Sequence, residues 1–176
     1  MRISRRDRDA VIEKRDRQAV ISMCDRPAVD NRQRKVRVAR RPLESFLRRV
    51  QDELGLGEAG VTICLVSDAE IARMNETFRK KKGPTDVLSF PSVVRRTPVR
   101  LRLASSKVQT GEYLGDIAIS PATARRYARE HGRQLSSELR VLILHGLLHL
   151  LGYDHETDRG KMERIERNLR KRFGLA

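Results

Sequence analysis

Three histidines lie close together in the segment 145–155, which reads HGLLHLLGYDH. His145 and His149 are four residues apart in an apolar helical run, so their side chains project from the same helix face. Gly152 can end that helix in the left-handed conformation, and the chain can then turn back and bring His155 toward the same point. Three imidazoles leave the fourth position of a tetrahedral ion for water, as in a catalytic zinc site. We therefore expect one Zn²⁺ per chain, bound by these three histidines.

The residue after the first histidine indicates which reaction such a site supports. The spacing H-x-x-x-H-x-x-G-x-x-H matches the zinc site of metzincin-type peptidases, in which a catalytic Glu follows the first histidine. This chain has Gly146 at that position, so the usual general base of a peptidase is missing. An isolated pair of histidines four apart is more often a metal-free helix surface, and it is the added glycine and third histidine that favour a metal here. The pattern predicts hydrolysis of a substrate other than a peptide.

The charge of the chain indicates what that substrate is. The formal net charge is +15 and the isoelectric point is about 10.9, which favours a polyanionic partner, with nucleic acid as the first candidate. Arg79 begins a run of four cations that ends at Lys82, before a Gly-Pro turn. A guanidinium can hold a phosphate through two parallel hydrogen bonds. A solvated basic loop is the alternative reading of the same run.

Two aspartates are candidate catalytic residues beside Arg79. Gly146 cannot accept a proton, so Asp116, Asp154 or an oxygen of a phosphate substrate must do so. Asp154 precedes His155 and can instead orient its imidazole. With RNA as substrate the nucleophile can also be the 2′-hydroxyl group, which demands no strong carboxylate base. The sequence leaves these routes open.

Cysteine usage and hydropathy predict the compartment. Cys24 and Cys64 are forty residues apart and form no C-x-x-C pair, which fits a reducing cytoplasm and no zinc ligation by sulfur. The N-terminal residues contain no apolar core of a signal peptide, and no run of 18 apolar residues occurs. We expect a soluble cytoplasmic protein without a membrane partner.

The first 27 residues differ from the rest of the chain. They hold a nine-residue repeat whose copies begin at Asp7, Asp16 and Asp25, which is too short for a solenoid unit. We expect residues 1–27 to be an appended and mobile extension, and residues 28–176 to form a single metallohydrolase domain.

The remainder alternates between strand and helix patterns, which predicts an α+β fold. It comprises a small mixed sheet of about four strands packed with about five helices, and the zinc site lies on a central helix and the turn after it. The expected strands are 28–31, 61–66, 86–90 and 115–120. The expected helices begin at Pro42, at Ser67 or Asp68 (with Ile71, Met74 and Phe78 inward), at Pro121 after a Ser120 cap, at Ser136 or Ser137, and at Thr157. Residues 92–112 are expected to form a loop.

Four motifs together resemble the YbeY family of bacterial rRNA maturation factors. They are N-x-x-x-R at 75–79, P-T-D-V-L-S-F-P at 84–91, G-D-I-x-I-S at 115–120 and the histidine motif at 145–155. The resemblance covers about residues 28–176. It implies an α+β sandwich with zinc bound by His145, His149 and His155, and it makes Arg79 the functional arginine.

The resemblance also implies a function. It is a zinc-dependent, single-strand-specific endoribonuclease in rRNA maturation, especially at the 3′ end of small-subunit rRNA, and in ribosome quality control. The expected partners are rRNA or other single-stranded RNA, and proteins of the small ribosomal subunit. The main alternative is a non-catalytic assembly factor in which zinc stabilises the fold. A peptidase is disfavoured by Gly146 and by the positive charge.

Overall fold

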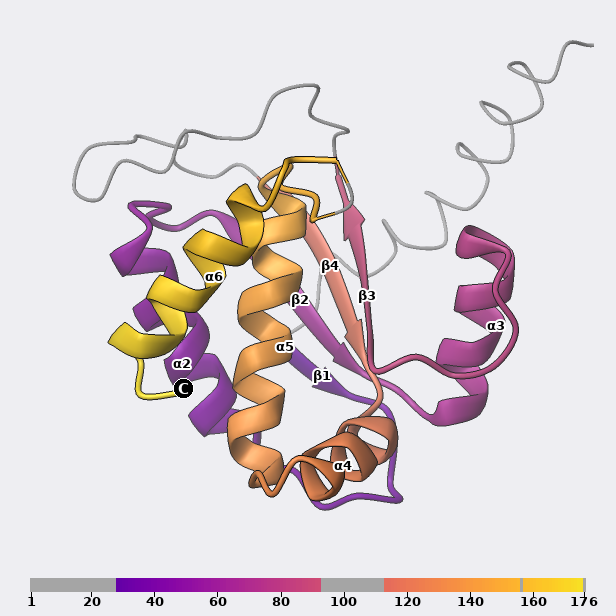
Figure 1. Cartoon of the computed structure of the whole chain (residues 1–176). Helices are drawn as coiled ribbons and strands as arrows, with labels where there is room; N and C mark the ends of the chain where they lie inside the picture. The colour runs from indigo at the N-terminus through magenta and orange to yellow at the C-terminus, as the bar shows by residue number, and fades with distance from the viewer. Residues whose placement is uncertain (1–27, 93–112, 156, 176) are drawn as a thin grey trace, which may run out of the picture.

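The computed structural model describes residues 28–92, 113–155 and 157–175. Within these residues the chain forms four strands and five helices around one mixed sheet, which confirms the predicted fold class (Figure 1). The strands are β1 (Val29–Asn31), β2 (Gly60–Leu65), β3 (Val87–Pro91) and β4 (Tyr113–Ile119). The helices are α2 (Arg40–Glu53), α3 (Asp68–Arg79), α4 (Pro121–Glu130), α5 (Leu135–Leu150) and α6 (Lys161–Arg172). The predicted N-terminal extension and nearly all of the predicted loop 92–112 lie outside the described residues.

The sheet has the strand order β1-β2-β4-β3. Strands β1, β2 and β4 are parallel to one another, whereas β3 is antiparallel to β4 and forms an edge. Helix α5 crosses one face of the sheet, with α2 and α6 beside it, and α3 lies on the other side (Figure 1). The edge strand β3 therefore runs alongside α5, where the histidines are located.

Helix α5 is the centre of the larger core. Its side chains are apolar on nearly every side, as expected of a helix enclosed by other elements. Leu139, Ile143, Leu144 and Leu147 are at most 2 % exposed and pack between the sheet and helices α2 and α6. Despite this composition, neither α5 nor any other helix of the described residues is long and apolar enough to cross a membrane.

A smaller apolar cluster holds α3 against the opposite face of the sheet. It contains Cys64, Val66, Ile71, Leu88 and Ala118, with Met74 and Phe90 packed against it. The prediction that Phe78 faces inward is wrong, because its side chain is 43 % exposed. Helical spacing alone misplaces it, since Phe78 lies in the last turn of α3 and beyond this cluster.

Hydrogen bonds to Asp68 join the start of α3 to the start of α4. Its carboxylate accepts hydrogen bonds from the hydroxyl groups of Ser120 and Thr123 and from the guanidinium of Arg126. Burial alone would raise the pKa of Asp68, but these hydrogen bonds and the charge of Arg126 outweigh it and lower the pKa to about 2. This network therefore ties the N-terminal ends of α3 and α4 to each other.

Three helix starts differ from those predicted. Helix α2 begins at Arg40, two residues before Pro42, which still lies in the first turn, where its missing N–H is tolerated. Helix α5 begins at Leu135, because Gln134 occupies the N-cap position and its backbone carbonyl accepts hydrogen bonds from the amide groups of Ser137 and Glu138. Helix α6 begins at Lys161 rather than at Thr157. Positive φ angles at Arg159 and Gly160 prevent an earlier start.

Candidate metal centre

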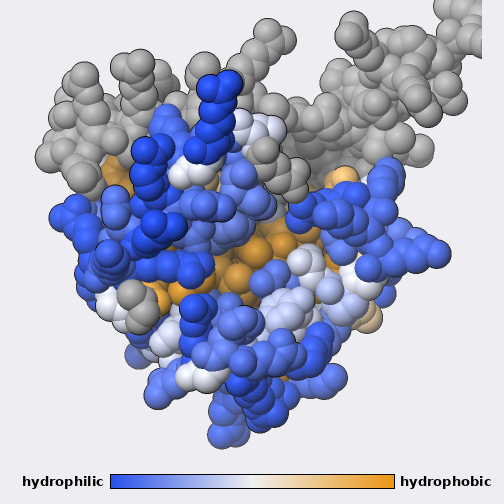
Figure 2. Space-filling view, viewed as in Figure 1, coloured by the Kyte–Doolittle hydropathy of each residue, from blue (hydrophilic) through white to orange (hydrophobic). Residues whose placement is uncertain are grey.

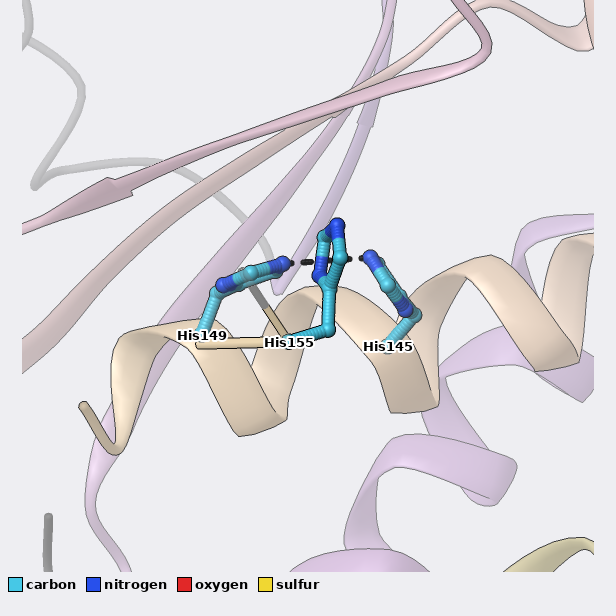
Figure 3. Close-up of side chains that lie close together, drawn as sticks. All are labelled: His145, His149 and His155. Carbon is cyan, nitrogen blue, oxygen red and sulfur yellow. Dashed lines mark hydrogen bonds between the residues drawn. The ribbon is translucent and has the colours of Figure 1, made fainter. Parts of the chain in front are cut away.

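The three histidines of the motif converge in space, as the spacing predicts. His145 and His149 extend from one face of α5, and His155 reaches them from the turn that follows (Figure 3). One ligand atom from each ring lies within 4.8 Å of the other two. The ring centroids are separated by 4.7, 5.5 and 5.3 Å. The side chains thus form one cluster of imidazole nitrogens that could hold a metal ion.

The turn after α5 is a Schellman motif, and it is what returns His155 to the helix. Gly152 adopts a φ of +87°, and its amide donates to the carbonyl of His149 at 2.9 Å. The amide of Tyr153 donates to the carbonyl of Leu148 at 3.1 Å. This pair of bonds with a left-handed residue between them defines the motif. A side chain at Gly152 would be strained in this conformation.

The separation of two of these ligand atoms is compatible with a shared tetrahedral metal ion. The Nε2 atoms of His145 and His149 are 3.1 Å apart. Two ligands at about 2.0–2.1 Å from zinc in tetrahedral geometry are roughly 3.3 Å apart, so the observed separation is close to that required. Burial, and then the neighbouring imidazoles of His145 and His155, lower the pKa of His149 below its usual value. The neutral imidazole thereby favoured is the form that binds metal.

A buried carboxylate lies behind the first ligand. Glu166 on α6 is 8 % exposed, and its Oε2 is 3.0 Å from Nδ1 of His145. Its other oxygen pairs with Arg170. Burial would raise the pKa of Glu166, but the hydrogen bond with His145 and the nearby charges outweigh it and lower the pKa. With Nδ1 of His145 held in this way, Nε2 is left facing the cluster, which is the arrangement of a carboxylate-supported metal ligand.

The structure gives Gly146 a physical role. A Cβ atom at this position would lie 2.7 Å from Cγ2 of Ile117 on β4, which is closer than side chains tolerate. The Gly146 carbonyl accepts a hydrogen bond from the hydroxyl of Ser89 on β3 at 3.3 Å. Gly146 therefore lets α5 approach the sheet closely, and a larger residue at this position would meet Ile117.

The histidines line a cleft of about 780 Å³. Its walls are β3, the end of α3, one face of α5 and the turn after α5. Leu88, Val141 and Leu142 contribute apolar side chains to it. Figure 2 shows hydrophobic residues gathered in the hollowed middle of this face, with strongly hydrophilic residues around them. The cleft therefore combines an apolar floor with the imidazole cluster.

Arg79, a candidate from the sequence, lines the same cleft as the histidines. It is the last residue of α3, and Lys80 after it takes the left-handed conformation with a φ of 57°. The buried side chain of Asn75 donates to the carbonyl of Gly83 at 3.0 Å. The backbone carbonyl of Asn75 accepts a hydrogen bond from the amide of Lys81 at 3.3 Å. Asn75 thus holds the basic loop against α3, which explains the pairing of Asn and Arg in the N-x-x-x-R motif.

The two candidate aspartates lie in different places. Asp154 lines the cleft, and its carboxylate accepts a hydrogen bond from Thr157 at 3.1 Å. Asp116 is 3 % exposed and does not line the cleft. Since Ile117 meets α5, and successive strand residues point to opposite faces, Asp116 faces away from the histidines. Its carboxylate accepts a hydrogen bond from Tyr113 at 2.8 Å.

Known proteins resemble this chain over nearly all of the residues that the structure describes. A sequence model described as Endoribonuclease YbeY matches residues 28–174. An Endoribonuclease YbeY of Solibacter usitatus is 45% identical over 137 residues, which cover 77% of this chain and 81% of the relative. One of Aquifex aeolicus is 39% identical over 136 residues, or 77% of this chain and 82% of the relative. A Thermotoga maritima protein solved in solution aligns with a TM-score of 0.52 and 28% identity, covering 80% of this chain and 85% of that one.

Proposed function

Because the chain belongs to the endoribonuclease YbeY family, we propose that it is a zinc-dependent endoribonuclease that cuts single-stranded RNA during rRNA maturation. On the basis of the sequence motifs that resemble this family, we propose that it acts at the 3′ end of small-subunit rRNA and in ribosome quality control. The observation that supports it best is that the three histidines and Arg79 line one cleft.

In this proposal His145, His149 and His155 hold one Zn²⁺ ion. When bound, zinc would supply Lewis acidity, which withdraws charge from a phosphoryl oxygen and lowers the pKa of a water molecule toward 7. Glu166 keeps the ring of His145 in the orientation that presents Nε2. Zinc matches a site of imidazoles alone.

Arg79 is proposed to bind the phosphate group that reacts. Its guanidinium can donate two parallel hydrogen bonds to phosphate oxygens, and it stabilises the additional negative charge that these oxygens carry in the transition state. The lysines that follow it raise the local positive potential without a fixed geometry. Asn75 anchors the loop, so Arg79 meets the substrate from a fixed position.

Asp154 is the proposed proton acceptor among the protein's carboxylates. It lies in the cleft beside His155, whereas Asp116 faces the other side of the sheet and is proposed instead to fix Tyr113. A phosphate oxygen of the substrate is the alternative acceptor. The nucleophile is either a water molecule or the 2′-hydroxyl of the RNA, and the two are distinguished by the product, since only 2′-hydroxyl attack leaves a cyclic phosphate.

Cleavage of a small-subunit rRNA precursor tests this proposal. We expect the wild type to cut it, and Arg79→Ala and His149→Ala to bind it without cutting. Asp116→Asn is the matched control for Asp154→Asn, since only the latter should reduce the rate. If wild type and variants cut equally, the cleavage comes from a contaminant. If the pure wild type binds but never cuts, the protein is the alternative, a zinc-stabilised assembly factor.

We also propose the domain organisation and setting of the enzyme. Residues 28–176 form its single domain, and residues 1–27 are an extension outside the family match, which begins at residue 28. The setting is the cytoplasm, where its partners are rRNA and proteins of the small ribosomal subunit.

A further inference from the structure

An aromatic side chain stands exposed at the rim of the cleft. Within the described parts of the chain, Phe78 and Tyr127 are the large apolar side chains that remain exposed, at 43 % and 41 %. Tyr127 is on α4, away from the histidines, whereas Phe78 lines the cleft. An exposed ring in a cleft is a candidate contact for a ligand.

Phe78 is held in place by a second ring. The Phe78 and Phe90 centroids are 5.0 Å apart, and their planes meet at 71°, the edge-to-face arrangement that aromatic pairs favour. Phe90 comes from β3 and packs against the smaller apolar cluster, whereas Phe78 lies outside it. The pair therefore joins the end of α3 to the edge strand and leaves part of the Phe78 ring uncovered.

The groups around Phe78 indicate which kind of ligand would contact its exposed ring. Arg79 is the next residue and lines the same cleft, and three lysines follow it. A ligand that suits both features carries negative charge beside a flat apolar ring. A nucleotide does so, because its phosphate and its base are linked through the sugar. The cleft of about 780 Å³ is within the range of sites that enclose such a ligand.

We propose that Phe78, supported by Phe90, stacks against one unpaired nucleobase of the RNA next to the phosphate held by Arg79. This inference rests on the proposed function, and it makes Phe78 the residue that distinguishes single-stranded RNA from a duplex. In a duplex both faces of a base are covered by its neighbours, so only an unpaired base can offer its face to the ring. Because every base has such a face, the contact selects against pairing and not for a sequence.

Affinity measurements test the contact. The probe is a labelled ten-nucleotide RNA with 2′-O-methyl groups, whose integrity is checked by electrophoresis, and binding is followed by fluorescence anisotropy. Stacking on one base contributes enough that Phe78→Leu should weaken binding on the order of 10-fold. Tyr127→Leu, which removes a ring of similar exposure outside the cleft, should leave binding unchanged. Equal affinity of Phe78→Leu and wild type would overturn the proposal.

A set of abasic probes shows whether a base is what the ring touches. A ten-nucleotide RNA lacking one base is tested at each position in turn. For one position the loss should match that of Phe78→Leu, and the two losses should not add. If Phe78→Leu weakens every abasic probe by the same factor, the ring acts by packing, and base stacking is refuted.

A fluorescence experiment covers the case in which Phe78→Leu fails to fold. The chain contains no tryptophan, so Phe78→Trp introduces a single tryptophan, whose emission can be excited selectively over that of the three tyrosines. RNA should quench its emission, and the probe without the stacked base should not. Tyr127→Trp is the control and should not respond. Absence of quenching while RNA still binds overturns the stacking contact and leaves the endoribonuclease proposal intact. Absence of any RNA binding by the wild type would refute both.

Discussion

The substitution Glu166→Gln tests the proposed metal centre through a residue that contacts the ligand His145. The carboxylate is 3.0 Å from Nδ1 of His145, and its side chain is 10% exposed, so solvent screens this contact little. Glutamine keeps the size of the side chain and one acceptor oxygen but removes the negative charge. We expect the variant to fold and to bind Zn²⁺ more weakly, because the imidazole loses its charged partner.

The size of the effect follows from the hydrogen bond that changes. A buried hydrogen bond to a charged group contributes about 1.5–3 kcal/mol, and a neutral one about 0.5–1.5 kcal/mol. The difference of about 1–2 kcal/mol corresponds to roughly 5- to 30-fold in affinity, since about 1.4 kcal/mol is tenfold. Carboxylates behind ligating histidines typically change metal affinity by about 10- to 100-fold, which agrees with this value.

Competition with a chromophoric zinc chelator at neutral pH measures this change. Glu163→Gln is the matched control, because Glu163 lies on the same helix but is exposed. The melting temperatures of the metal-free variants separate a loss of folding, including loss of the pair with Arg170, from a loss of metal binding. Equal zinc affinity of both variants and the wild type would refute the proposed role of Glu166.

Three further substitutions or deletions test other parts of the structure. Gly146→Ala should lower the free energy of unfolding by about 1 kcal/mol, since a clash of about 1–3 kcal/mol exceeds the gain of about 1 kcal/mol in helix propensity. Urea denaturation should show that this loss disappears when Ile117→Ala removes the clashing side chain. The pKa of Asp68 is lowered from 3.8 to about 2, so its stabilising contribution is present above about pH 4 and is lost as the pH falls toward 2. A shift of this size corresponds to about 2 kcal/mol, which screening around the exposed Arg126 reduces to about 1 kcal/mol. The difference in unfolding free energy between wild type and Asp68→Asn should therefore vanish near pH 2, and a constant difference would contradict the ion pair. Deletion of residues 1–22 should leave zinc content and melting temperature unchanged, and a large loss of either would show that the extension belongs to the domain.

The parts of the site that could be predicted from the sequence depend on local geometry. The histidine cluster follows from helical periodicity and a glycine turn, both of which act within a few residues. Glu166 could not be predicted, because it is 21 residues from His145 and meets it only through the packing of α6 on α5. No spacing rule identifies such a partner.

The orientations of Asp116 and Phe78 could not be predicted, because they depend on which face of a strand or helix is covered by its neighbours. Asp116 and Ile117 are adjacent in a strand pattern, and the sequence does not state which of them α5 will cover. The structure shows that Ile117 meets Gly146, so Asp116 faces the other side. Phe78 has the spacing of a core residue of α3, but that helix extends past the apolar cluster before it ends.

The short sequence span of the proposed ligands has a consequence for the denatured chain. All three histidines lie within eleven residues, so bringing them together closes only small loops and costs little chain entropy. A metal ion can therefore retain some affinity for the unfolded chain. Ligand binding stabilises a fold only to the extent that the native state binds more tightly than the unfolded one. We expect added zinc to raise the melting temperature less than its affinity for the native protein alone would imply.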